Sequence, residues 1–397
     1  MSKLMVVIPT KNEKNNLLKI VTILKSSLSE IEHQIVISNN SNDEIDRRLS
    51  IYNVELLKTP QIFMTVEEHI FWVIQQISGE YVWFLGDDDI PIEDGVRKLT
   101  KIINQGNFDC LTFNGVRYHS KNNKFIKMIN HKNGYRGKLQ YFHENSGLLN
   151  GPASISLYVT KREFLSEKYI NEIQDLSAPI YSHLTFFLRS FSNTNFAYFP
   201  IDIIQHVKSD KKQAKNFSPN WVTFAQNSGN FYHFPWTLGL LRNINYLIKS
   251  KAINEDFLSR IIETDPRSRR YQLLPQIEDY IRLAFITRKK NLRQITESEV
   301  LELRQLVSEI PGFSKELKMF ISVEDPSREI LKIYPHMKPK TQYWRNKVMV
   351  LKYRFVVVFR QALKDFFWIL VTKLWVFTPK FMKLFLKKLR LMMRRWR

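Results

Sequence analysis

The sequence predicts an α/β fold built on a mainly parallel β-sheet, and two observations support this prediction. Over about the first 115 residues, short β-branched and aromatic runs alternate with segments in which apolar residues recur at helical spacing. An order of strand, helix, strand, strand, helix, strand is typical of a parallel sheet with helices packed on it. Ligands of such sheets bind beyond the carboxyl ends of the strands, so we expect a site at that edge.

The individual elements follow from these patterns in chain order. Strands are expected at 4–8, 34–38, 54–57, 81–85 and 108–114, and helices at 17–24, 66–77 and 96–103. Residues 115–147 are polar and aromatic with scattered glycines, which predicts an irregular loop. Two later apolar runs, 154–159 and 201–205, are expected to be strand-like.

The segment that follows the fourth strand carries three consecutive carboxylates, Asp87, Asp88 and Asp89. Carboxylates this close repel one another unless a proton or a cation lies between them. Hard oxygen ligands at a strand end suit Mg²⁺ or Mn²⁺ shared with a phosphate group. The alternative is a solvated acidic turn, because Asp and Pro are ordinary turn residues.

Two further polar clusters follow the first and second expected strands. They are Pro9-Thr10-Lys11-Asn12-Glu13 and Asn39-Asn40-Ser41-Asn42-Asp43. The carboxyl ends of parallel strands share one edge of a sheet, so we expect both clusters to lie near the three carboxylates. This shared location favours a functional site over an acidic surface turn.

In order and spacing, these segments resemble the family 2 glycosyltransferases with a GT-A fold, which use nucleotide-sugar donors. The matching residues are 8–13, 36–43 and 79–89. The sequence of residues 83–89, Trp-Phe-Leu-Gly-Asp-Asp-Asp, is most similar to the abequosyltransferase-type branch, which builds O-antigens. The resemblance implies inverting, metal-dependent transfer of a sugar to a glycan during bacterial surface polysaccharide synthesis.

The resemblance also implies roles for individual residues. Asp88 and Asp89 would bind Mg²⁺ or Mn²⁺ as the DXD-type metal site that bridges the diphosphate. Gly86 stands where many members carry the first Asp of that motif, so the ligating carboxylate among the three stays open. Asn39 stands where the family often has Asp, and His69 where it often has Asn. The residues expected at the donor nucleotide are Pro9, Thr10, Glu13, Asn39 and Asp87.

The general base is expected in the second half of the domain, where the family places it on an acceptor-facing segment. Inverting transfer needs a carboxylate or a histidine to take the proton of the acceptor hydroxyl. The candidates are Asp175 and His183. Asp175 fits a helix-surface charge or cap equally well, and His183, which opens an apolar run, fits a buried structural histidine.

Two other features could serve the donor site. His206 follows an apolar run and could reach the metal or the phosphates, although a core or surface role also fits. A basic segment holds Lys208, Lys211, Lys212 and Lys215. It could close over a diphosphate or simply be solvated.

The chain is expected to divide into a GT-A domain at 1–230, a helical acceptor or scaffold region at 231–337, and a tail at 338–397. One helix of the middle region is well marked. Thr296 and Glu299 form a capping box, and Pro311 ends the apolar pattern that follows.

The tail contains most of the charge. It has seventeen basic residues and one acidic residue, so it contributes +16 to the net charge of +22. After Pro379, basic and apolar residues separate onto opposite sides of a helix, which predicts binding in the plane of an anionic membrane surface. Docking to a protein partner is the alternative.

Membrane binding agrees with a lipid-linked glycan acceptor at the inner face of the bacterial cytoplasmic membrane. We expect no secretory signal and no transmembrane helix, and a single cysteine fits a reducing compartment. Two other functions remain open. A sugar nucleotidyltransferase usually carries a Gly-rich phosphate loop near the N-terminus, where this chain has 9–13 without glycine. Nucleic-acid binding would explain the charge but leave the apolar face unexplained.

Overall fold

The computed structural model describes residues 2–11, 14–63, 65–119, 124–149, 151–176, 182–206, 234–264, 270–275, 277–278, 281 and 296–322. The predicted donor residue Glu13, the basic segment at 208–215 and the predicted membrane tail at 338–397 lie outside these residues. No helix of the described part is both long and apolar enough to cross a membrane.

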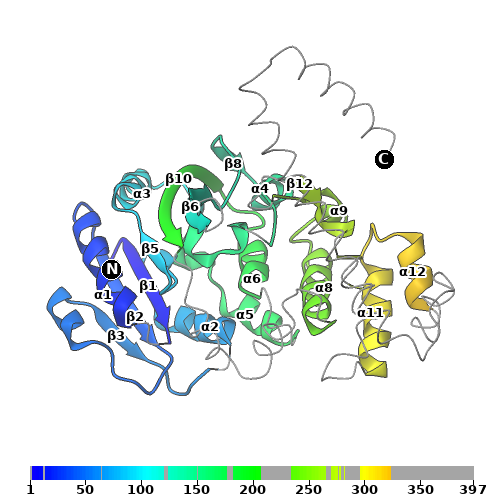
Figure 1. Ribbon diagram of the computed structural model, residues 1–397, viewed down its shortest axis with the longest axis horizontal. Coiled ribbons are helices and arrows are strands. Elements are labelled where there is room, and N and C mark those ends of the chain that lie inside the picture. The colour runs from blue at the N-terminus through cyan, green and yellow to red at the C-terminus, as the bar shows by residue number, and fades with distance from the viewer. Residues whose placement is uncertain are drawn as a thin grey trace, which may run out of the picture. The chain divides into compact units, whose positions relative to one another are not determined.

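The described residues up to 206 contain one mixed ten-stranded sheet (Figure 1). Its strands are β1 (Leu4–Thr10), β2 (His33–Asn39), β3 (Glu55–Lys58), β4 (Tyr81–Phe84), β5 (Asp89–Pro91), β6 (Cys110–His119), β7 (Lys124–Lys127), β8 (Tyr135–Gly137), β9 (Tyr158–Lys161) and β10 (Phe196–His206). They lie in the order β3-β2-β1-β4-β9-β6-β10-β5, with β7 beside β6 and β8 beside β10.

Helices follow or connect these strands. They are α1 (Lys14–Ser27), α2 (Val66–Gln76), α3 (Glu93–Gln105), α4 (Leu139–Ser146), α5 (Glu167–Gln174), α6 (Ser182–Ser190), α8 (Phe234–Lys249), α9 (Phe257–Arg260), α11 (Glu297–Glu309) and α12 (Lys315–Ser322). Short 3₁₀ helices occupy Arg47–Tyr52, Gly151–Ala153, Ile155–Leu157 and Arg162–Phe164. Helix α1 packs against α3, α2 against α6, and α8 against both α6 and α11.

The first half of the sheet confirms the predicted parallel arrangement. Strands β3, β2, β1 and β4 are parallel neighbours, and every residue of β4 is buried. Such burial is expected for a central parallel strand with both faces covered. Local signals set the connecting helices: Thr65 and Glu68 form a capping box at the start of α2, and Gly106 ends α3 with φ 70°.

The second half of the sheet is mostly antiparallel, and the sequence patterns assigned no direction to its strands. Strand β9 lies between β4 and β6 and is antiparallel to both, and β5 is antiparallel to β10. Only β6 and β10 are parallel to each other there. Local periodicity could not give these directions, because β9 and β10 pair with strands far away in sequence.

The prediction of an irregular loop over 115–147 was wrong. Strand β6 continues to His119 and pairs with β7, and β8 and α4 follow. The side-chain amide of Asn114 binds both the N–H and the C=O of Ile129 at 2.9 Å, so the connection returns to β6. These pairings give the polar segment regular structure that its composition did not suggest.

The described residues after 233 include helices α8, α9, α11 and α12, and the predicted capping box of Thr296 and the end of α11 before Pro311 are present. A small antiparallel pair was missed, β11 (Ile262–Thr264) with β12 (Arg270–Gln272). The predicted division at 230 and 337 stays a prediction.

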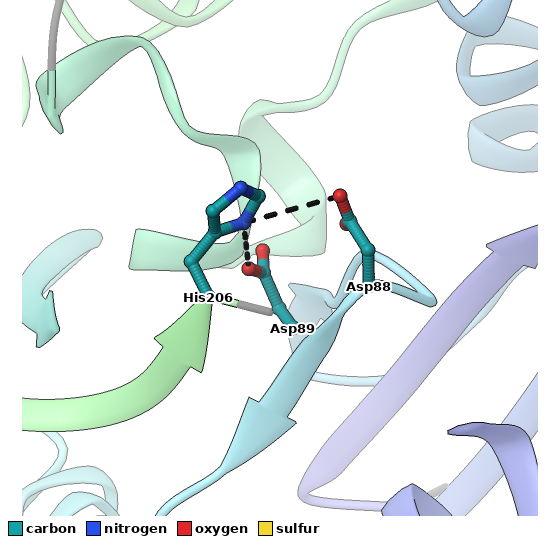
Figure 2. A group of neighbouring side chains, drawn as sticks. All are labelled: Asp88, Asp89 and His206. Carbon is teal, nitrogen blue, oxygen red and sulfur yellow. Dashed lines mark hydrogen bonds and ion pairs between the residues drawn. The ribbon is translucent and has the colours of Figure 1, made fainter. Parts of the chain in front are cut away.

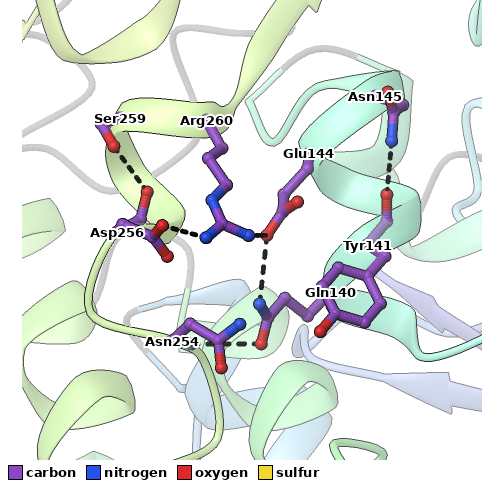
Figure 3. A network of polar contacts seen from close by, with 8 residues as sticks. All are labelled: Gln140, Tyr141, Glu144, Asn145, Asn254, Asp256, Ser259 and Arg260. Atoms are coloured by element: carbon purple, nitrogen blue, oxygen red, sulfur yellow. Dashed lines mark hydrogen bonds and ion pairs between the residues drawn. The ribbon is translucent and has the colours of Figure 1, made fainter.

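Polar contacts join the helical region to α4 (Figure 3). The side-chain amide of Gln140 donates to Glu144 Oε1 at 3.1 Å, and its oxygen accepts from the N–H of Asn254 at 3.1 Å. Arg260 pairs with Asp256 and reaches Glu144 Oε1 at 3.9 Å. The two regions therefore meet through a small polar network.

Candidate active site

A tight turn after β4 carries the three consecutive carboxylates. The N–H of Asp89 donates to the C=O of Gly86 at 3.1 Å, so Asp87 and Asp88 occupy the two central positions. The turn is fixed to the sheet, because the N–H of Leu85 donates to the C=O of Val7 at 2.9 Å. This arrangement places the carboxylates at the carboxyl end of the parallel strands, as the sequence predicted.

Gly86 lies close to Ser156 and to the Asp88 carboxylate. Its N–H donates to Ser156 Oγ at 2.8 Å, and a Cβ at this position would lie 2.9 Å from Asp88 Oδ1. A side chain here would therefore displace the Asp88 carboxylate. The glycine thus leaves the Asp88 carboxylate in its present position.

Asp88 and Asp89 share a site with His206, which ends strand β10 (Figure 2). His206 Nδ1 lies 2.8 Å from Asp89 Oδ1 and 3.9 Å from Asp88 Oδ2. One ligand atom from each residue lies within 4.8 Å of the others. Asp89 is only 4% exposed, whereas Asp88 and His206 open toward solvent.

Strand register creates this group. Asp89 on β5 pairs with His206 on β10, and His206 pairs in turn with Arg117 on β6. A carboxylate, an imidazole and a guanidinium therefore occupy one row across three neighbouring strands. The sequence suggested that His206 could reach the metal, but it did not show that the two residues would pair across adjacent strands.

The electrostatics of the group favour an added positive charge. Burial, followed by the charge of Asp89, raises the pKa of Asp88 to about 7. The hydrogen bond to Asp89 raises the pKa of His206. Both shifts show that the group favours an extra proton near neutral pH, a place that a divalent cation can take instead.

The donor set fits such a cation. Two carboxylate oxygens are ligands that Mg²⁺ and Mn²⁺ prefer, and an imidazole nitrogen extends the set toward Mn²⁺. Asp88, Asp89 and His206 would be the residues that hold it, since one ligand atom of each lies within 4.8 Å of the others. Asp88 and Asp89, both predicted as metal ligands, are thus brought together with a third candidate ligand.

Asp87 turns toward the opposite side. The Thr10 hydroxyl, at the end of β1, donates to Asp87 Oδ2 at 2.6 Å. The predicted donor residues Thr10 and Asp87 are therefore in contact, next to Pro9 in the same strand. Only the other two carboxylates belong to the group with His206.

Asn39 and Asn40 shape the end of β2. The Asn39 amide donates to the C=O of Asp43 at 2.8 Å, and its oxygen accepts from the Ser41 hydroxyl at 2.9 Å. Each of its polar atoms still has capacity for one further bond, so recognition of a base by Asn39 stays a prediction. Asn40 clamps the backbone of Phe63, accepting from its N–H at 2.7 Å and donating to its C=O at 3.0 Å.

His69 is a buried, neutral residue. It is 3% exposed, its Nε2 lies 2.7 Å from the Ser38 hydroxyl, and burial lowers its pKa to about 4. Its ring packs against both Phe63 and Trp72, with centroids 6.0 and 6.5 Å away, and the three rings form one cluster. His69 thus belongs to an aromatic cluster next to β2.

The two predicted bases occupy different surroundings. His183 on α6 lies 2.9 Å from the C=O of Ala153 through Nε2 and 3.5 Å from Glu67 Oε1 through Nδ1. Asp175 follows the last turn of α5 and is exposed, and its carboxylate makes no hydrogen bond to the described residues. Neither role is tested by these positions. The contacts of His183 agree with the structural alternative.

Comparison with known families supports the sequence prediction for the N-terminal region. Residues 5–164 match the family model described as Glycosyl transferase family 2. This part of the chain is therefore similar to a glycosyl transferase family 2 domain. Together with the mixed α/β sheet, the match supports the predicted GT-A type of domain. His206 lies beyond the matched range.

Several solved structures are similar to this chain. S. aureus TarS 1–349 in complex with UDP-GlcNAc has a TM-score of 0.49 at 11% identity, with 80% of this chain and 86% of that chain covered. The longer TarS structure has a TM-score of 0.46 at 10% identity over 79% of this chain, which spans only 50% of that protein. Glucosyl-3-phosphoglycerate synthase from Mycobacterium tuberculosis, in complex with Mn²⁺, UDP-glucose and phosphoglyceric acid, has a TM-score of 0.35 at 15% identity, covering 57% and 80%. No curated protein sequence matches the chain.

Proposed function

We propose that this protein is an inverting, cation-dependent glycosyltransferase that moves a sugar from a nucleotide-diphosphate sugar to a hydroxyl of a glycan. The observation that carries the proposal is the group of Asp88, Asp89 and His206. It lies at the carboxyl end of the parallel strands, and its two carboxylates belong to the range that matches family 2. Ligands of α/β sheets bind at this edge, and a diphosphate needs positive charge there.

The reaction forms one bond and breaks another. The acceptor oxygen bonds to the anomeric carbon, the bond from that carbon to the diphosphate oxygen breaks, and its electron pair leaves with the diphosphate. The hydroxyl proton passes to a side-chain base. A bound divalent cation supplies positive charge that stabilises the leaving diphosphate. Asp88, Asp89 and His206 would hold this cation, and Thr10 orients Asp87 on the nucleotide side.

Of the two candidate bases, we propose Asp175. Its exposed carboxylate has no hydrogen bond to the described residues and can accept a proton. His183 Nε2 faces a carbonyl oxygen and so must donate, which leaves only the nitrogen beside Glu67. Asp175→Asn should lower kcat by about 10²-fold with little change in donor affinity. If kcat fell only in His183→Gln and not in Asp175→Asn, His183 and not Asp175 would be the base.

A screen of nucleotide sugars tests the function itself. Purified protein is incubated with UDP-, GDP-, dTDP- and CDP-sugars, and hydrolysis and thermal stabilisation are measured with Mn²⁺, Mg²⁺ or EDTA. The proposal expects one nucleotide class to be hydrolysed and to stabilise the protein only with a divalent cation. Absence of both effects for every donor, or equal effects in EDTA, would contradict it.

The acceptor and its location extend the proposal. The resemblance of 83–89 to the abequosyltransferase branch supports a surface polysaccharide acceptor on a lipid carrier. The amphipathic pattern of 338–397 supports binding to the inner face of the cytoplasmic membrane. The full chain should float with anionic vesicles, whereas a chain ending at 337 should not. Equal flotation of the two would contradict the membrane assignment.

A further inference from the structure

A hollow of about 510 Å³ lies beside α2, outside the acidic group. It is open to solvent and is bordered by the segment before α2, one side of α2 and residues of α5. Its volume falls within the range of about 300–1,000 Å³ that is usual for small-molecule sites. Every residue that lines it belongs to the described part of the chain.

Aromatic rings form one wall of this hollow. The rings of Phe63 and Trp72 lie 5.8 Å apart, and the buried His69 ring stacks against both. The Asn40 amide fixes the backbone of Phe63, and Ser38 fixes His69. These bonds hold the Phe63 backbone and the His69 ring in place, which lowers the entropy that these groups lose when a ligand binds.

Uncharged polar groups surround the rings. Within the part of the chain that the structure describes, no hydrogen bond engages the amides of Gln61, Gln75 and Gln174 or the indole N–H of Trp72. Each amide offers two donors and an acceptor. Glu68 contributes a carboxylate, and the lining residues include no lysine or arginine. The hollow therefore suits a neutral ligand rich in hydroxyl groups better than a phosphate or a lipid chain.

We propose that this hollow binds a neutral sugar residue of the acceptor glycan, with one ring face on Trp72 and its hydroxyls on the glutamines. A pyranose presents C–H groups on its faces and hydroxyls around its rim, which matches an aromatic wall bordered by amides. Gln174 directly precedes Asp175, so a sugar held here lies on the side of the proposed base. This inference rests on the proposed glycosyl transfer.

The test uses the full-length protein and an array of neutral oligosaccharides. Wild type should bind a subset of them, and Trp72→Ala should weaken that binding by about tenfold or more. Trp72→Phe should retain most of it. Gln174→Ala, an exposed change that leaves the core intact, should weaken it severalfold. Tyr141→Ala is the matched control and should not change binding, because Tyr141 is an exposed aromatic residue on α4 that does not line the hollow.

Donor hydrolysis separates this inference from the proposed function. All four variants should hydrolyse the nucleotide sugar at the wild-type rate, because none changes the acidic group. Binding by Trp72→Ala and Gln174→Ala equal to that of Tyr141→Ala overturns the inference, as does a wild type that hydrolyses donor but binds no oligosaccharide. Oligosaccharide binding without hydrolysis of any donor supports the sugar site and counts against the transferase.

Discussion

The two halves of the central sheet differ in how their strands find their neighbours. In the half formed by β3, β2, β1 and β4, all pairs are parallel and successive strands are joined by short connections or helices. In the other half, β9 enters antiparallel between β4 and β6, and three-residue β5 pairs with the distant β10. The acidic turn stands between them. Asp87 contacts Thr10 of the first half, whereas Asp89 contacts His206 of the second.

This comparison shows that the candidate cation site belongs to neither half alone. Asp89 and His206 are 117 residues apart in sequence, and register alone brings them to 2.8 Å. Changes to the turn should therefore remove the site, whereas changes in the second half should weaken it.

The largest effect is expected from the double change of Asp88 and Asp89 to alanine. Loss of both carboxylates removes the cation site, so transfer should fall by about 10³-fold or more, and cation-dependent donor binding should disappear. Steady-state transfer rates and calorimetry with Mn²⁺ measure the two effects. Asp94→Ala is the matched control, because that carboxylate pairs with Lys98 on the exposed face of α3. Full activity of the double variant would falsify the assignment.

A smaller effect is expected from His206→Ala. Removing one of three ligands should raise the Mn²⁺ concentration for half-maximal activity by at least about tenfold. Excess Mn²⁺ should then restore much of the rate, which a general loss of structure would not permit. A variant with an unchanged Mn²⁺ requirement would show that the second half contributes no ligand.

The close packing of the second half can be tested at Gly95 in α3. A Cβ there would lie 2.1 Å from the C=O of Asp202 on β10. Alanine gains about 1 kcal/mol of helix propensity, but the clash should outweigh it and leave a net loss of about 1–3 kcal/mol. Gly134→Ala, whose Cβ would meet its nearest neighbour at 3.4 Å, is the control. Denaturant unfolding measures the free energy of unfolding of both variants. A Gly95→Ala variant more stable than wild type would contradict the close contact between α3 and β10.

The smallest effect concerns acid stability, to which each half contributes one buried histidine. Burial lowers the pKa of His69, beside β2, and of His143, on α4, to about 4. In the unfolded chain both would titrate near 6.5, so the unfolded state binds more protons between these values. Stability is therefore retained above pH 6.5 and lost as the pH falls toward 4. Each histidine should cost about 1 kcal/mol at pH 5.5.

His69→Gln and His143→Gln test this dependence. Each change should flatten the loss of unfolding free energy between pH 7.5 and 5.5, whatever its effect at neutral pH. Unfolding of wild type and both variants at the two pH values measures the slope. An unaltered slope in both variants would show that these histidines do not cause the acid sensitivity.

The sequence predicted the first half and its polar strand ends well, because the signals there are local. Apolar runs gave the strands, and Thr296 with Glu299 marked a helix start that the structure confirms. The equivalent capping box of Thr65 and Glu68 was missed. Strands β7 and β8 and helix α4 in the segment 115–147 were also missed, since their pairing partners lie elsewhere in the chain. The roles of Asp175 and His183 stay predictions.

By itself, the sequence determined that three carboxylates follow a buried strand and that they belong to an α/β domain with two more polar strand ends. Only the tertiary structure decided which partners each of those carboxylates contacts. Asp87 turns to Thr10, whereas Asp88 and Asp89 meet His206. The physical reason is that local side-chain patterns specify a strand and its turn, whereas the partner across an antiparallel pair is set by register and packing of the whole sheet.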